Sequence, residues 1–124
     1  MKSIKTVLVV DDNQINRQIL KKILLDEYHI IEAENGQIAL DILTKGETEF
    51  SAILLDLTMP VMDGYTFLRR VQDNSSIKNI PIIVTTSHSE TEKEIEALKM
   101  GAWDFVTKPY NPEVILFRLR NAIS

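Results

Sequence analysis

The stretch Ala52-Ile53-Leu54-Leu55-Asp56-Leu57-Thr58-Met59-Pro60 decides the fold. Four apolar residues lead into a carboxylate, and Pro60 then prevents the strand from continuing. A continuous apolar run is typical of a strand covered on both faces, as in a parallel sheet. Asp56 therefore lies where a buried strand ends, and open α/β sheets bind ligands at that end. This position favours a functional carboxylate over an ordinary turn residue, although aspartate is common in turns.

Apolar runs and helical patterns alternate along the rest of the chain. The predicted strands cover residues 5–10, 29–33, 52–56 within the opening stretch, 81–86 and 103–107, and a helical pattern follows each of them. This order requires right-handed crossovers and a parallel sheet clad by helices on both sides. For 124 residues we predict one domain, residues 1-124, with a flavodoxin-like α/β fold. Its doubly wound (βα)5 sheet would have five strands in the order 2-1-3-4-5.

Helical spacing predicts which side chains of each helix point inward. The inward sets are Ile15, Ile19, Leu20, Ile23 and Leu24; Ile38, Ala39, Ile42 and Leu43; Phe67, Leu68 and Val71; Ile95, Leu98 and Met100; and Ile115, Leu119, Ala122 and Ile123. Arg17, Lys21 and Lys22 are expected outside. The last helix is more apolar than one face needs, so Val114, Leu116 or Phe117 would lie partly outside.

Composition and charge narrow the classes of function. The net charge is −4, and no Lys/Arg run is longer than a pair, so direct nucleic-acid binding through phosphate neutralisation is not expected. The chain has no cysteine, which excludes disulfides and Cys-based zinc sites. The apolar run Val7-Leu8-Val9-Val10 is too short for a signal peptide or a membrane span. We expect a cytoplasmic protein with no membrane association.

Five polar residues end the predicted strands. Asp11 and Asp12 follow the first strand, and Asp56, Thr86 and Lys108 end the third, fourth and fifth. These strand ends share one edge of a parallel sheet, so three carboxylates, a hydroxyl and an ammonium should meet there. Such crowded carboxylates require cations. Lys108 offsets one, and Mg²⁺ is the expected hard metal ion because it pairs with phosphate oxygens.

This constellation predicts phosphoryl chemistry on a carboxylate. The metal ion and the ammonium would neutralise charge during in-line transfer, and a carboxylate can be the acceptor. Asp56 is the best nucleophile because its strand is central. Asp11 and Asp12 on the neighbouring strand are better placed as metal ligands.

At these residues the sequence resembles the receiver domains of two-component response regulators, among them the single-domain chemotaxis regulators, over its whole length. The motifs are Asp11-Asp12, Asp56, Met59-Pro60, Asp63-Gly64, Thr86 and Lys108-Pro109. Their spacing agrees with the family pattern: Thr86 lies 30 residues after Asp56, and Lys108 lies 22 after Thr86.

The resemblance implies a phosphoprotein that takes its phosphoryl group from a sensor histidine kinase or a phosphotransfer protein. Asp56 would be the acceptor, Asp11, Asp12, Asp56 and the backbone carbonyl of Thr58 the Mg²⁺ ligands, and Lys108 and Thr86 catalytic partners. The receiver would catalyse its own phosphorylation and dephosphorylation and would otherwise not be an enzyme. Thr86 would then move toward the phosphoryl group, with Phe105 as the switch aromatic behind it. The fourth helix, fifth strand and fifth helix would dock an output domain or partner, or a second copy in a homodimer, and Arg118 would lie on that face.

Three residues are candidates for tuning the lifetime of the phosphorylated state. Ser87 stands where the family often has alanine and would narrow access to the phosphoryl site. Thr58 and His88 would flank the path of the attacking water, and His88 would add a pH dependence near neutrality. The alternative is that Thr58 and His88 are ordinary exposed loop residues.

Three other functions compete. A haloacid-dehalogenase-type phosphatase needs a second aspartate two residues after the nucleophile, where this chain has Thr58. A flavodoxin would cradle a phosphate in the first loop, where Asp11 and Asp12 would repel it. A scaffold-type receiver that is never phosphorylated would not need the complete set of Asp, Thr and Lys.

Overall fold

Five parallel strands form one sheet in the order β2-β1-β3-β4-β5. The structure is a computed structural model that describes residues 4–57, 59, 61–87 and 91–123. The strands are β1 (Thr6–Val10), β2 (His29–Ala33), β3 (Ala52–Asp56), β4 (Ile82–Thr86) and β5 (Asp104–Thr107). A helix follows each strand: α1 (Gln14–Leu24), α2 (Gly36–Lys45), α3 (Gly64–Gln72), α4 (Thr91–Lys99) and α5 (Pro112–Ile123). The predicted fold and strand order are therefore confirmed.

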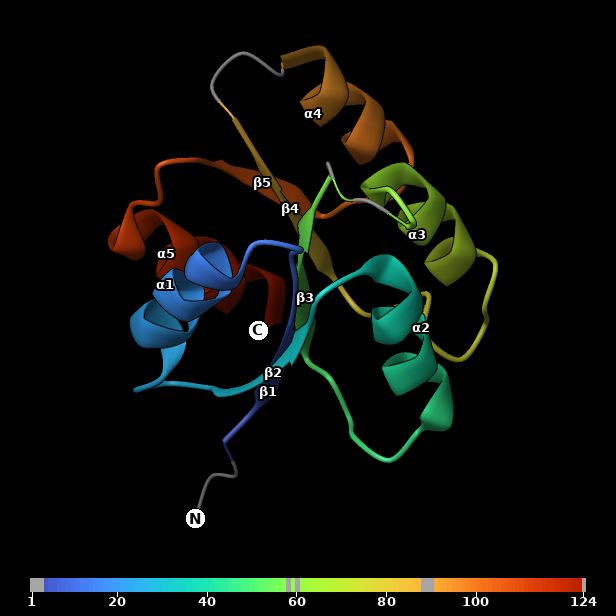
Figure 1. Cartoon of the computed structure of the whole chain (residues 1–124), viewed down its shortest axis with the longest axis horizontal. Coiled ribbons are helices and arrows are strands. Elements are labelled where there is room, and N and C mark those ends of the chain that lie inside the picture. The colour runs from blue at the N-terminus through green and yellow to red at the C-terminus, as the bar shows by residue number, and fades with distance from the viewer. Residues whose placement is uncertain (1–3, 58, 60, 88–90, 124) are drawn as a thin grey trace.

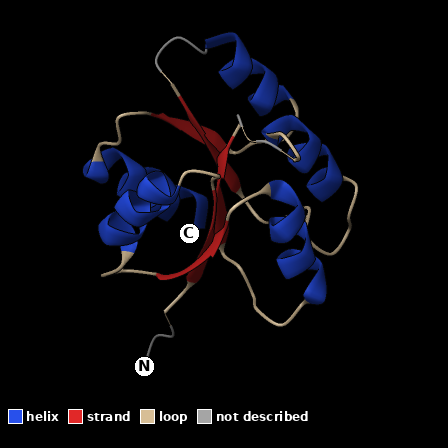
Figure 2. Ribbon diagram, in the orientation of Figure 1, coloured by secondary structure: helices blue, strands red, loops and turns tan. Residues whose placement is uncertain are grey.

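The helices cover both faces of the sheet (Figures 1 and 2). α1 and α5 lie on one face, and α2, α3 and α4 lie on the other. Alternate strand residues feed two separate cores: Leu54 and Ile83 face α1 and α5, whereas Leu55 and Val84 face the other three helices. All residues of β3 and β4 are buried. This burial explains the uninterrupted apolar runs of the sequence.

Short polar side chains start several helices. Asn13, Asn35 and Asp63 each accept a hydrogen bond from the backbone N–H three residues later, which satisfies a donor that the helix itself leaves unpaired. Asn111 does the same at α5, where it accepts from Glu113 and Val114. These caps fix where each helix leaves the edge of the sheet that carries the predicted site.

The inward face of α1 differs from the prediction. Leu20 and Leu24 are buried, but Ile15 is 67% exposed and Ile19 is 43% exposed. Arg17, expected outside, has a side chain that is only 14% exposed. Arg17 lies inward and has polar partners there, Glu32 on β2 and the Asp11 carbonyl after β1, while Ile15 and Ile19 lie on the solvent side of α1.

The inward face of α4 is also wrong in the prediction. Ile95 and Leu98 are exposed, and the buried residues of this helix are Glu94 and Ala97. The prediction for α5 is confirmed: Ile115 and Leu119 are fully buried, while Val114 and Phe117 are exposed.

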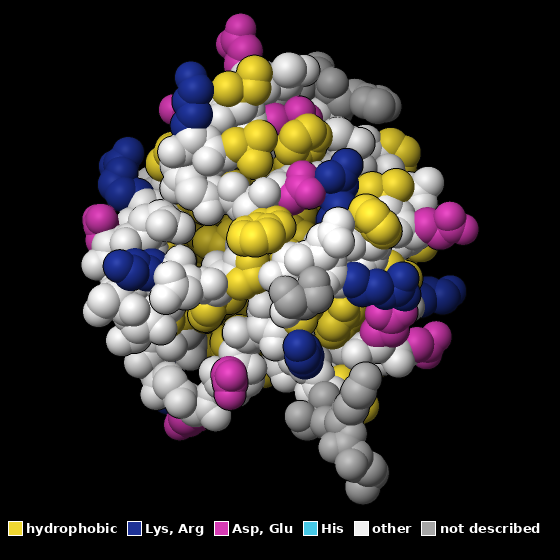
Figure 3. All heavy atoms as spheres, turned by 180° about the vertical axis from the view of Figure 1, so that it is seen from behind, with side chains coloured by type: hydrophobic (Ala, Val, Ile, Leu, Met, Phe, Trp, Pro, Cys, Tyr) yellow, Lys and Arg dark blue, Asp and Glu magenta, His cyan; other side chains and the backbone are white. Residues whose placement is uncertain are grey.

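Charged side chains of both signs are spread over the face seen in Figure 3. Hydrophobic side chains show between them near the middle of that view. None of the helices in the described ranges combines the length and the apolar character that crossing a bilayer would need.

Candidate functional site

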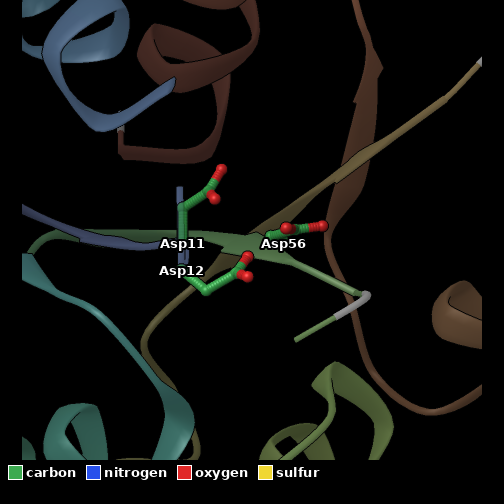
Figure 4. Close-up of side chains that lie close together, drawn as sticks. All are labelled: Asp11, Asp12 and Asp56. Atoms are coloured by element: carbon green, nitrogen blue, oxygen red, sulfur yellow. The ribbon is translucent and has the colours of Figure 1, made fainter. Parts of the chain in front are cut away.

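Three carboxylates meet at the carboxyl ends of β1 and β3. Asp11 and Asp12 follow β1, and Asp56 is the last residue of β3. The two strands are neighbours in register, with Val10 opposite Leu55, so the residues that follow each strand come together. One carboxylate oxygen from each residue lies within 4.8 Å of the others. Figure 4 shows the three side chains at adjacent strand ends.

Asp11 is the most buried of the three. Its side chain is almost fully inaccessible, and its Oδ1 accepts a hydrogen bond of 2.9 Å from the Asn13 backbone N–H. Its Oδ2 is buried and has no hydrogen-bond partner among the described residues. Burial raises the pKa of Asp11, and the hydrogen bond from Asn13 and the nearby Lys108 ammonium only partly oppose this shift. A bound cation would relieve the cost of this charge.

Arg17 holds the backbone of Asp11 in place. Its guanidinium donates a hydrogen bond of 2.8 Å to the Asp11 carbonyl and one of 3.2 Å to Glu32 Oε1 on β2. A planar guanidinium supplies both donors at once. Arg17 therefore connects α1, β2 and the loop that carries Asp11.

Lys108 supplies the positive charge of the site. It follows β5, and its backbone N–H continues the ladder by donating to the Thr86 carbonyl at 2.7 Å. The side-chain Nζ lies 3.5 Å from Asp56 Oδ1, and the following peptide bond to Pro109 is cis. The ammonium thus faces the central carboxylate.

The loop after Asp56 is closed by Gly64. Its backbone N–H donates a hydrogen bond of 2.9 Å to the Leu57 carbonyl. A Cβ at this position would lie 2.5 Å from Leu57 Cα, which is too close for any side chain. Glycine at position 64 therefore lets α3 begin directly against the end of β3.

Thr86 does not face Asp56. Asp56 is in register with Thr85, and side chains alternate along a strand, so Thr85 shares the face of Asp56 and Thr86 points to the opposite face. The Thr86 hydroxyl donates a hydrogen bond of 2.9 Å to Glu94 Oε1 on α4. The structure therefore brings together Asp11, Asp12, Asp56 and Lys108, while the Thr86 hydroxyl is held on the α4 side.

Two further hydroxyls belong to the face of Asp11 and Asp56. Thr85 Oγ1 and the Tyr110 OH are buried without a hydrogen-bond partner among the described residues. Burial raises the pKa of the Tyr110 phenol, the nearby Thr85 hydroxyl partly opposes this shift, and the charges of Asp11 and Asp56 add to it. Tyr110 is therefore a neutral donor close to two carboxylates.

The remaining predicted residues lie around this centre or outside the described part. Phe105 on β5 is partly buried against the core under α2, α3 and α4, and the Arg118 guanidinium carbon lies 5.8 Å from the centre of its ring. Ser87 is half-buried. Thr58 and His88 lie outside the described residues, so their predicted roles stay predictions.

The cluster fits a hard divalent cation. Its donors are carboxylate oxygens, and one of them, Asp11 Oδ2, is buried without a partner among the described residues. Oxygen donors of this kind suit Mg²⁺ rather than zinc or copper.

Four residues with contacts at this edge were not predicted: Arg17, Thr85, Glu94 and Tyr110. Tyr110 could have been found, because it directly follows the Lys108-Pro109 pair. Arg17 and Glu94 have no local signal, because their partners come from other elements, and Thr85 is identified only by its register with Asp56.

The chain is similar to known signalling proteins. A family model described as "Response regulator receiver domain" matches residues 7–120. "Sensor histidine kinase CheAY" of Helicobacter pylori is 35% identical over 118 residues, which are 94% of this chain and 15% of that protein. "Chemotaxis protein CheY homolog" of Campylobacter jejuni is 34% identical over 94% of this chain and 91% of that protein.

A solved structure of a chemotaxis protein is also similar to this chain. Chemotaxis protein CheY4 of Vibrio cholerae superimposes with a TM-score of 0.87 at 35% identity. The match covers 97% of this chain and 99% of that one. The chain thus has nearly the full length of the chemotaxis proteins it matches, but spans only a small part of the Helicobacter kinase.

Proposed function

The chain belongs to the response regulator receiver domain family, and we propose that it accepts a phosphoryl group on Asp56. It is a receiver domain of the kind found in histidine-kinase signalling systems and is not a classical enzyme. The proposal names the acceptor residue and the metal ligands, and it states that the domain catalyses the transfer itself.

One observation carries it. One carboxylate oxygen from each of Asp11, Asp12 and Asp56 lies within 4.8 Å of the others, and the Lys108 Nζ is 3.5 Å from Asp56 Oδ1. A pure scaffold gains nothing from such repulsion, since each buried charge costs free energy. A site that binds a cation together with an anionic group needs such a cluster of carboxylates.

Transfer needs little from the protein beyond placement and charge. An Asp56 carboxylate oxygen attacks the phosphorus of a phosphohistidine or a small phosphodonor. The new P–O bond forms while the bond to the leaving nitrogen or oxygen breaks, and the electron pair leaves with that atom. Lys108 would stabilise negative charge on the transferring group, and the fully buried β3 fixes the backbone of Asp56.

Asp11, Asp12 and Asp56 would hold Mg²⁺, with the backbone carbonyl of Thr58 as a further ligand outside the described residues. When bound, the ion supplies charge neutralisation for the phosphoryl oxygens. The Asn13 backbone N–H holds Asp11 Oδ1, and Arg17 holds the Asp11 backbone carbonyl.

Receiver domains interact with histidine kinases and with output partners, and homologues of this chain are fused to kinases. For this chain we propose a histidine kinase or phosphotransfer protein as donor, self-catalysed hydrolysis of the acyl phosphate, and output through α4, β5 and α5. Thr86 and Phe105 would take part in the switch.

The test is incubation with Mg²⁺ and acetyl phosphate followed by intact mass. We expect a gain of one phosphoryl group that Asp56→Asn abolishes. Asp26→Asn, a matched change at an exposed acid on another surface, should keep it. Sustained release of phosphate from many substrates would instead indicate the phosphatase alternative, and no gain would indicate a scaffold.

A further inference from the structure

The Thr86 hydroxyl forms a hydrogen bond to a residue on α4. It donates to Glu94 Oε1 at 2.9 Å, and both residues are buried, Thr86 at 1% exposure and Glu94 at 8%. A glutamate is almost never buried without a partner, because its carboxylate loses hydration. This hydrogen bond is therefore what makes the inward position of Glu94 tolerable.

The rest of α4 has little apolar surface to hold it. Ala97 is the other buried residue of this helix, and Ile95 and Leu98 are exposed. A second polar link comes from α3, where the Tyr65 OH donates to the Lys93 carbonyl at 3.3 Å. The position of α4 on the sheet thus depends on polar contacts more than the position of α5, which buries Ile115 and Leu119.

A threonine hydroxyl has one proton, so it donates one hydrogen bond at a time. Donating to a phosphoryl oxygen on Asp56 and donating to Glu94 are therefore mutually exclusive. Breaking the bond leaves the Glu94 carboxylate buried and unpaired, which favours movement of Glu94 toward water.

Resting on the proposed function, the geometry points to Glu94 as a positioning residue that holds the Thr86 hydroxyl away from Asp56 until the site is phosphorylated. Release of Thr86 by Glu94 then frees α4. The Thr86 hydroxyl thus donates to Glu94 before phosphorylation of Asp56 and to the phosphoryl group after it.

Phe105 explains why the coupling passes through α4. Its ring has no hydroxyl to hydrogen-bond Thr86, and it packs beside Arg118, which is itself paired with Asp104 Oδ2 at 2.9 Å. Glu94 accepts the hydrogen bond of the Thr86 hydroxyl, so movement of the hydroxyl changes the contacts of Glu94 directly.

The experiment measures binding of beryllium fluoride, which takes the place of a phosphoryl group on a carboxylate, by calorimetry at saturating Mg²⁺. The native protein must break the Thr86–Glu94 bond before Thr86 can reach the bound group. Glu94→Ala removes that cost, and we expect binding about tenfold tighter, the equivalent of one hydrogen bond to a charged acceptor. Glu94→Gln keeps a neutral acceptor and the shape of the side chain, and we expect about threefold.

Two controls separate positioning from a merely structural role. Glu96→Ala makes the same charge change on an exposed position of α4 and should leave the affinity unchanged. In a Thr86→Ala background, which has no hydroxyl to release, Glu94→Gln should also have no effect. A double-mutant cycle of this kind isolates the coupling between the two side chains.

Equal affinities for the native protein and Glu94→Gln, or a Glu94→Gln effect that persists without the Thr86 hydroxyl, would overturn the inference while the proposed function stands. A native protein that neither binds beryllium fluoride nor gains a phosphoryl group would overturn the proposed function itself.

Discussion

The Nζ of Lys108 lies 3.5 Å from Oδ1 of Asp56, across the carboxyl ends of two strands that β4 separates. This contact places a positive charge from β5 on the central carboxylate of a negatively charged cluster. It is a partly buried pair, so solvent screens it less than a surface pair.

Lys108→Ala should slow phosphorylation of Asp56 by acetyl phosphate about a hundredfold, because the charge that stabilises the transferring group is lost. The rate is measured as phosphoryl gain by intact mass at fixed Mg²⁺. Lys22→Ala makes the same charge change on the exposed side of α1 and should leave the rate unchanged. Equal rates for both variants would exclude the assigned role of Lys108.

Asp12→Asn should raise the melting temperature without metal and remove most of the stabilisation by Mg²⁺. Asp12 is the exposed member of the carboxylate cluster, so its replacement relieves repulsion and deletes one ligand. At a hundred times its dissociation constant, a ligand stabilises the native protein by about 2.7 kcal/mol. Thermal melts with Mg²⁺ and with EDTA check both effects, and Asp41→Asn serves as the exposed control. A full Mg²⁺ shift in Asp12→Asn would contradict this ligand assignment.

Arg17→Ala should lower the free energy of unfolding by about 1.5–3 kcal/mol, because it removes charge-assisted hydrogen bonds to the Asp11 carbonyl and to Glu32. Arg17→Lys should recover little, since an ammonium does not offer the same pair of donors. Urea unfolding gives the stability, and titration of the folded variants with Mg²⁺ should show weaker binding. Full recovery by lysine would mean that only the charge matters.

Gly64→Ala should destabilise the protein by about 1–3 kcal/mol through overpacking against Leu57. Gly46→Ala is the informative comparison. Gly46 has a positive φ of 72° and open space around a Cβ, so the cost there is backbone strain alone, about 1–2 kcal/mol. Only Gly64→Ala should also slow phosphoryl gain, because Leu57 directly follows Asp56. Unchanged phosphorylation in Gly64→Ala would show that the close approach serves folding only.

Leu119→Ala should cost about 2–5 kcal/mol, and Phe117→Ala should change stability by less than about 0.5 kcal/mol. Both residues lie on α5, but Leu119 is fully buried and Phe117 is 63% exposed. Urea unfolding of the two variants checks the assignment. A large loss for Phe117→Ala in the isolated protein would mean that this ring packs in solution.

The sheet was predictable because buried parallel strands leave continuous apolar runs, and amphipathic helices leave a helical period, in a single sequence. The strand order could be predicted from the same pattern, and so could the proximity of Asp11, Asp12, Asp56 and Lys108 at one edge of the sheet. The observed strands begin one residue later than predicted at Thr6, Ile82 and Asp104, since the ladder and not the composition sets the ends.

The inward faces of α1 and α4 were not predictable in the same manner. A hydrophobic period assumes that charged side chains face water, and Arg17 and Glu94 break that assumption. Arg17 has the Asp11 carbonyl as its partner, and Glu94 has the Thr86 hydroxyl. Both partners come from other parts of the chain, the end of β4 and the loop after β1, so only the folded chain shows them.

The face to which the Thr86 side chain points was also not predictable from the sequence, because it depends on the pairing of strands. Adjacent threonines, Thr85 and Thr86, end β4, and the sequence alone does not say which shares the face of Asp56. The register with β3 decides it in favour of Thr85.

The complete burial of β3 and β4 has a consequence for how motion is distributed over the molecule. Amide protons on these strands should exchange with solvent only through global opening, whereas α4, with Ala97 as its single buried apolar residue, should exchange through far smaller fluctuations. Asp56 therefore ends a strand that should open rarely, whereas α4 should open more often. A structural change at Asp56 should therefore move α4 more readily than it moves the strands of the sheet.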